Sequence, residues 1–106
     1  MPRNRLRITV LKRVDPSYVF DGDVPVNPSS GRPYEICTAF QEGQEYVIDT
    51  DNRMPEGFCP QAWHDIFRKI GILHWGGSYT TEKKEMIACC TDGVRPVSFK
   101  LETLVD

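Results

Sequence analysis

The sequence has no apolar run that approaches the ~20 residues of a membrane-spanning helix. Arginines near the N-terminus are followed by strand-like alternation, whereas a signal peptide has a continuous apolar core and a small-residue cleavage site. We therefore expect no membrane partner and a cytoplasmic location, in which cysteines are normally kept as reduced thiols.

An excess of positive charge is also missing. The chain carries 13 Lys and Arg residues against 15 Asp and Glu residues, a formal net charge of -2. Phosphate neutralisation supplies most non-specific affinity for nucleic acids, so this balance predicts no nucleic-acid partner. The basic side chains that do cluster have the spacing of a strand's exposed face and flanks: Arg3, Arg5, Arg7, Lys12 and Arg13. A protein or small-molecule partner is left open.

Three motifs that usually announce a chemical site are absent. No Cys-x-x-Cys pair is present, although structural zinc sites usually take two ligands from one short knuckle. No Gly-x-Ser-x-Gly elbow is present either. Gly76-Gly77 lacks the further glycines and the lysine of a phosphate loop. None of these local motifs therefore marks a chemical site in this sequence.

The 106 residues are the length of a single domain, 1–106. Apolar residues make up 40% and charged residues 26%, which is ordinary for a globular protein. Four prolines and two glycines fall within about 15–36 and predict a long loop there. A connection of this length is usually either functional or mobile, and both interpretations stay open.

Outside that loop, the hydrophobic spacing predicts strands around one helix. Residues 6–14, 46–48 and 95–104 alternate between apolar and polar, and 86–90 is a short apolar run typical of a buried strand. Asp92-Gly93 predicts an antiparallel hairpin between the last two strands. The helix is expected to begin at Cys59-Pro60, with Gly71 as its C-terminal cap. Its apolar stripe is Trp63, Ile66, Phe67 and Ile70.

This order of elements predicts an α+β fold, with a small curled antiparallel sheet or a partly open barrel and one central helix.

Cys59 is the leading candidate for chemistry. At a helix start its sulfur would face free N–H groups and the positive end of the helix dipole, which favour a thiolate. His64 follows five residues later and is not quite on the same face, so a Cys–His pair is not implied. In the alternative interpretation Cys59 is a small apolar cap, and His64 and Asp65 lie on the solvated side of the helix.

Cys89 and Cys90 are adjacent, and neighbouring side chains in a strand point to opposite faces. Both could bind one ion only if a bulge or the following turn redirects one of them. A buried structural role for one member of the pair is the simpler alternative.

A metal site formed by all four cysteines is a more specific hypothesis than a structural role. Thiolates select zinc, copper(I) or iron–sulfur clusters. The separations along the chain are long, so ligands would have to converge in space: Cys37, Cys59, Cys89 and Cys90.

Residues 55–66 read PEGFC-x-x-AW-x-DI, and residues 88–100 read ACC-x-DG-x-RPV-x-FK. With these two motifs the chain resembles a family of small, mostly prokaryotic proteins of unknown function. Members also carry a cysteine ahead of a Gly-[Asp/Gln]-Glu-[Phe/Tyr] strand, which Cys37 and residues 43–46 match. The resemblance implies that all four cysteines belong to one family pattern, but it implies no activity. The Pro-rich segment at about 15–35 departs from that pattern.

Together these patterns predict a thiol-centred site that binds a soft metal or performs thiol redox chemistry. One alternative is a non-catalytic interaction module whose cysteines are structural. Another is a small-molecule enzyme with Cys59 as nucleophile and His64 or His74 as base.

Overall fold

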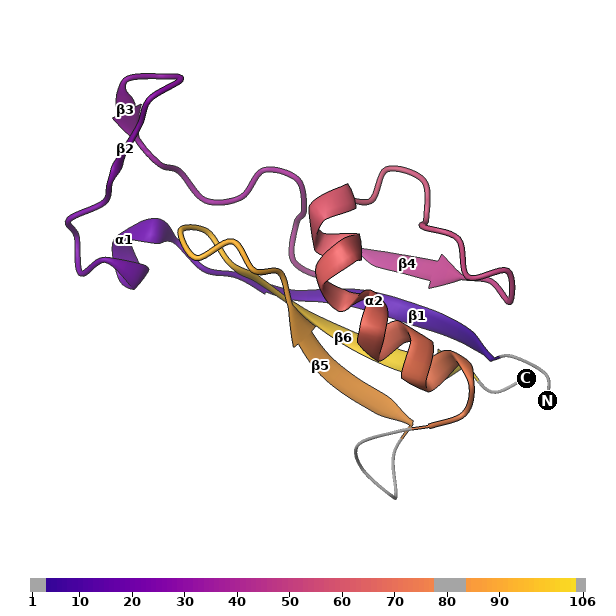
Figure 1. The fold of residues 1–106 in the computed structure, drawn as a ribbon. Coiled ribbons are helices and arrows are strands. Elements are labelled where there is room, and N and C mark those ends of the chain that lie inside the picture. Colours follow the sequence, from indigo (N-terminus) through magenta and orange to yellow (C-terminus); the bar gives the residue numbers. More distant parts are fainter. Residues whose placement is uncertain (1–3, 78–83, 105–106) are drawn as a thin grey trace.

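A computed structural model describes residues 4–77 and 84–104 of the chain, and the fold is α+β as the sequence predicts (Figure 1). Arg3, the first member of the predicted basic cluster, lies outside the described residues. The elements follow in this order: β1 (Arg5–Arg13), α1 (Pro16–Val19), β2 (Val26–Asn27), β3 (Arg32–Pro33), β4 (Glu45–Ile48), α2 (Pro60–His74), β5 (Glu85–Cys89) and β6 (Val97–Leu104).

Four strands form an antiparallel sheet in the order β4-β1-β6-β5. The first and last strands of the sequence pair in its middle, with Ile8 opposite Leu101, and a register shift interrupts β1 between Val10 and Lys12. In the described part of the chain β4 does not pair with β5, so the sheet is curled and open and no closed barrel forms. α2 lies across one face of this sheet (Figure 1).

The core lies between α2 and that face. Alternate residues of the strands are buried, as period-two spacing requires, and they meet one stripe of the helix. Phe40 and Phe58 extend the core beyond the sheet, since their rings are 5.0 Å apart and both contact Phe99. The fully buried aliphatic side chains of the strands and helix include Leu6, Ile8, Val10, Ile48, Ile66, Ile70, Leu73, Val97 and Leu101.

The helix ends later than the sequence indicates. α2 continues through Gly71 to His74, and Gly76, with φ of +87°, follows the cap residue Trp75. Gly77 N–H donates to Ile72 O at 2.8 Å and Gly76 N–H to Leu73 O at 3.0 Å, the bond pattern of a glycine-terminated helix. The prediction that Gly71 caps the helix was therefore wrong.

The buried stripe of α2 is also shifted from the predicted one. Phe67 is 43% exposed, whereas Ala62, Leu73 and His74 are buried. Phe67 still contacts Trp63, with ring centroids 5.5 Å apart, so these two aromatic rings cover one edge of the helix.

The Pro-rich segment contains short elements only. Asp15 caps α1 by accepting a hydrogen bond from Ser17 N–H at 2.8 Å. β2 and β3 then form a two-stranded ribbon that extends away from the main sheet (Figure 1). Residues 34–40 lead back from this ribbon towards the start of α2.

None of the helices in residues 4–77 and 84–104 has the length and apolar character needed to cross a membrane.

Candidate thiol site

Cys59 is the N-cap residue of α2, with φ of -66° and ψ of 121°, and Pro60 occupies the first helical position. Cys59 O accepts from Trp63 N–H at 2.9 Å, while the side chain makes no capping hydrogen bond. The N–H groups of a helix's first turn have no partner within the helix. The half-buried Cys59 side chain packs partly against the core and does not accept from these donors.

Cys90 follows the end of β5 and packs partly against the core. Its N–H donates to Val97 O at 3.0 Å, and its Sγ accepts from Val97 N–H at 3.3 Å. Burial raises the pKa of the Cys90 thiol, backbone N–H groups of Asp92 and Val97 oppose that shift, and the charges of Asp92 and Cys37 reinforce it. Cys37 therefore lies close enough to act on the Cys90 thiol, although the two residues are 53 positions apart in the sequence.

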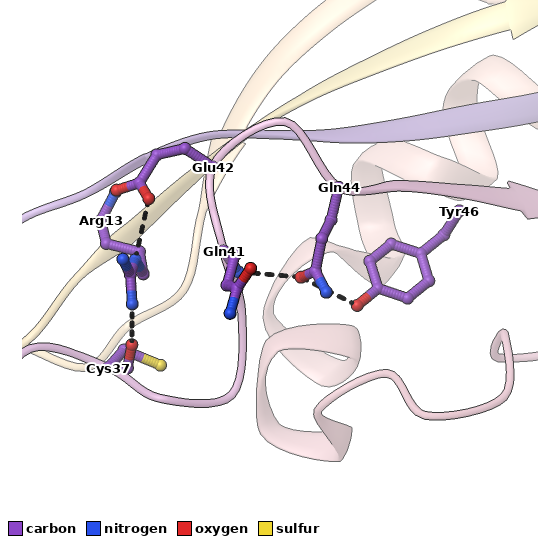
Figure 2. A network of polar contacts seen from close by, with 6 residues as sticks. All are labelled: Arg13, Cys37, Gln41, Glu42, Gln44 and Tyr46. Atoms are coloured by element: carbon purple, nitrogen blue, oxygen red, sulfur yellow. Dashed lines mark hydrogen bonds and ion pairs between the residues drawn. The ribbon is translucent and has the colours of Figure 1, made fainter.

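Cys37 is anchored to β1 through its backbone (Figure 2). Arg13 Nη1 donates to Cys37 O at 3.0 Å, and Arg13 Nε donates to Glu42 Oε2 at 3.1 Å. Glu42 Oε1 also accepts from Arg13 N–H at 3.1 Å. Gln44 Oε1 completes the same loop by accepting from Gln41 N–H at 2.8 Å. The extended segment that carries Cys37 is thus held by the end of a central strand.

These three cysteines line one cavity of about 40 Å³. They come from three separate parts of the chain: the segment after the ribbon, the start of α2 and the turn after β5. The apolar side of the lining is Phe40, Ala62 and Val97, and the polar side is Gln61, Asp92 and Arg95. A space of this size admits a few water molecules, so the three cysteines share a small cavity that does not enclose a larger ligand.

A contact that sequence reasoning missed fixes the turn carrying Cys90. Asp65 Oδ2 on α2 accepts from Thr91 N–H at 2.7 Å and from Thr91 Oγ1 at 2.9 Å. The alternative interpretation of Cys59 places Asp65 on the solvated side of the helix, whereas in the structure its carboxylate binds Thr91. No local pattern signals this pair, because the two residues are 26 positions apart and meet only when the hairpin packs beside the helix.

A second polar network rigidifies the same turn. Asp92 Oδ1 accepts from Val94 N–H at 3.0 Å and from Arg95 N–H at 3.2 Å, and Arg95 Nε donates to Asp92 Oδ2 at 3.1 Å. Burial alone would raise the pKa of Asp92, but these hydrogen bonds and the Arg95 charge outweigh it and lower that pKa. The Arg95 guanidinium also lies 5.3 Å from the centre of the Tyr34 ring.

Cys89 does not join the other three cysteines. It is exposed and shares the outer face of β5 with Ile87, while Met86 and Ala88 face the core. The alternation of adjacent strand residues therefore separates Cys89 from Cys90, and no bulge redirects either of them. In residues 4–77 and 84–104, no group of three or more His, Cys, Asp and Glu side chains is arranged to hold a metal ion.

The two histidines are placed differently. His64 is exposed on α2 and does not line the thiol cavity. His74 is the last residue of α2 and is 1% exposed, about 22 Å along the helix axis from Cys59 at 1.5 Å per residue. His74 is therefore too distant to act as a base for Cys59.

Comparison with protein-family models, with curated proteins and with solved structures gave no match in any of the three cases.

Proposed function

We propose that Cys37, Cys59 and Cys90 form a thiol–disulfide exchange site in a cytoplasmic protein. The observation that supports it is the shared cavity: three cysteines from separate segments line it, and the fourth is exposed on the opposite face of the sheet.

The burial of the three cysteines and their places in the fold support a nucleophile and a resolving partner. Burial keeps Cys90 in its thiol form at neutral pH, since its pKa is raised, and a thiol is a poor nucleophile. Cys59 lines the cavity at the start of α2, and its side chain makes no capping hydrogen bond that would occupy its sulfur. Cys59 therefore makes the first attack, and Cys37 or Cys90 completes the disulfide.

The co-reactant is a small disulfide, RS–SR. The Cys59 thiolate attacks one of its sulfurs, a protein–S–S–R bond forms, and RS⁻ leaves and takes up a proton. A second cavity cysteine loses its proton and attacks Cys59 Sγ, which releases the second RS⁻. The net change is two protein thiols and RS–SR converted to one protein disulfide and two RSH, and the reverse reaction oxidises two RSH to RS–SR while it reduces the protein disulfide.

The family resemblance also supports this site, since the three cavity cysteines are among the four that its pattern includes. It also carries the exposed Cys89, to which the exchange reaction gives no role. That residue provides a matched control within the chain, because it is the direct neighbour of Cys90 but lies outside the cavity.

Soft-metal binding is the second candidate, and one observation favours it: the Asp92 carboxylate lines the cavity together with the three thiols. Zinc, copper(I) or an iron–sulfur cluster would require these groups to move closer together than they are here. Metal analysis of anaerobically purified protein separates the two functions. Near one equivalent of a transition metal, lost in Cys59→Ser and retained in Cys89→Ser, would favour the metal site.

The exchange reaction is tested by oxidising the Cys89→Ser protein with hydroxyethyl disulfide and mapping its disulfides by mass spectrometry. We expect a single intramolecular disulfide that includes Cys59. The Cys59→Ser protein should form none at a comparable rate. Stable mixed adducts on every exposed thiol, with no internal disulfide, would instead support an interaction module with structural cysteines.

A further inference from the structure

A second cavity of about 190 Å³ lies between the β2–β3 ribbon, the segment that follows it and the turn after β5. Most of its lining is polar, and its side chains include Asn27, Ser30, Arg32, Glu35, Thr38 and Arg95. Drug-sized ligands occupy pockets of roughly 300–1,000 Å³, so this cavity suits a small polar group rather than a large cofactor.

Arg95 connects this cavity to the thiol site, because it lines both of them. Its guanidinium is held on one side by Asp92, at 3.1 Å, and on another by the Tyr34 ring. A guanidinium carries five N–H donors, and the single bond from Nε to Asp92 leaves donors that can point into the second cavity.

Arg32 supplies a second positive charge to the cavity wall. Within residues 4–77 and 84–104, no carboxylate lies within ion-pair distance of Arg32, although Glu35 lines the same cavity. The backbone of Arg32 is fixed, since its N–H donates to Ser30 Oγ at 3.2 Å. The cavity therefore presents two guanidinium groups and several hydroxyl and amide groups next to the thiols.

We propose that this second cavity binds the carboxylate of a small disulfide or thiol whose sulfur reaches the adjoining thiol cavity. The inference rests on the proposed exchange function and names its substrate class. Guanidinium groups match carboxylates in charge and geometry, and a bound carboxylate would hold the reactive sulfur near the three cysteines. The chemical step is the exchange already described, with RS–SR carrying a carboxylate in each R.

The test compares the rate of protein disulfide formation with dithiodiglycolate, a dianion, and with hydroxyethyl disulfide, which is neutral. We expect the ratio of the two rates to fall about tenfold in Arg32→Ala, the effect of losing one charge-assisted hydrogen bond. Arg53→Ala is the matched control: its side chain is 85% exposed and lines neither cavity, so the ratio should stay at the wild-type value.

A binding measurement makes the test independent of the redox reaction. Thiodiglycolate is a dianionic thioether that cannot exchange, and its titration should shift the NMR signals of Arg32 and Arg95 Nε. Those shifts should weaken as salt is added, because the contact is electrostatic and partly exposed.

The outcomes separate the two proposals. An internal disulfide that forms equally well with both reagents, in wild type and in Arg32→Ala, would overturn the carboxylate site and leave the exchange function intact. Thiodiglycolate binding without any internal disulfide would overturn the exchange function. A rate ratio that falls equally in Arg53→Ala would show a general charge effect, and that would also overturn the carboxylate site.

Discussion

The Asp65 carboxylate on α2 accepts two hydrogen bonds from Thr91, one from its N–H at 2.7 Å and one from its Oγ1 at 2.9 Å. Thr91 directly follows Cys90, so this contact ties the turn that carries Cys90 to the helix that Cys59 begins. It links two sides of the thiol cavity that are distant in sequence.

Breaking this contact should loosen the site. We expect a coupling energy of about 1 kcal/mol between Asp65→Ala and Thr91→Ala in a double-mutant cycle, measured by urea unfolding. The cycle is needed because alanine itself favours a helix more than aspartate does and would mask part of the loss in the single variant. Thr91→Ala removes only the hydroxyl donor and keeps the N–H, so additive single effects would show that the hydroxyl bond to Asp65 does not stabilise the turn.

The anchor of Cys37 provides a second prediction. Arg13→Ala removes the hydrogen bond to Cys37 O and the pairing with Glu42, so Cys37 should lose its fixed position. We expect slower formation of any disulfide that contains Cys37, measured by quenched alkylation and mass spectrometry. Arg53→Ala removes an equally charged side chain away from the site and should react at the wild-type rate.

Much of the fold is readable from local pattern. The alternation of Leu6, Ile8 and Val10 identifies β1, and Cys59-Pro60 identifies the start of α2, because these signals reside in neighbouring residues. The sequence does not locate the end of α2, because Gly71 and Gly76 are both plausible caps. Only the positive φ of Gly76 decides between them. Phe67 was misassigned because an apolar stripe defines the buried face only to within about one residue.

The site was only partly readable. Strand alternation anticipated that Cys89 and Cys90 point apart. Nothing local could indicate that Arg13 reaches Cys37 or that Asp65 reaches Thr91, since each pair forms only through tertiary packing. The cavity shared by Cys37, Cys59 and Cys90 depends on these contacts and so required the structure.

The Asp92 turn should respond to acid. Its pKa is lowered below the ordinary aspartate value of 3.8, so Asp92 binds a proton less readily when folded than when unfolded. Its contribution to stability is therefore fully present above pH 3.8 and is lost as pH falls through the lower folded value. An NMR titration of the Asp92 carboxyl should give a midpoint below 3.8. A midpoint at or above that value would show that Arg95 and the turn N–H groups do not hold the anion.

The Cys90 thiol should respond to base. Its pKa is raised above 9.0, mainly by burial, so Cys90 should alkylate slowly at neutral pH and speed up only above pH 9. The Cys90 thiol does not change the free energy of unfolding below the pKa that it has in the unfolded chain. Stability falls as pH rises from that pKa to the higher pKa of the folded protein. Iodoacetamide, with the labelled sites resolved by mass spectrometry, should alkylate Cys59 and the exposed Cys89 before Cys90. Labelling of Cys90 first would contradict its assignment as a buried thiol.

The central claim is that three of the four cysteines form one exchange site, and an equilibrium redox titration of the Cys89→Ser protein tests it most directly. The protein is equilibrated with buffers of hydroxyethyl disulfide and its thiol, quenched with acid and weighed intact by mass spectrometry. We predict one two-electron transition in which the protein loses two hydrogens and keeps one titratable thiol. A protein that keeps three thiols across the series, or that gains only reagent adducts, would contradict the account.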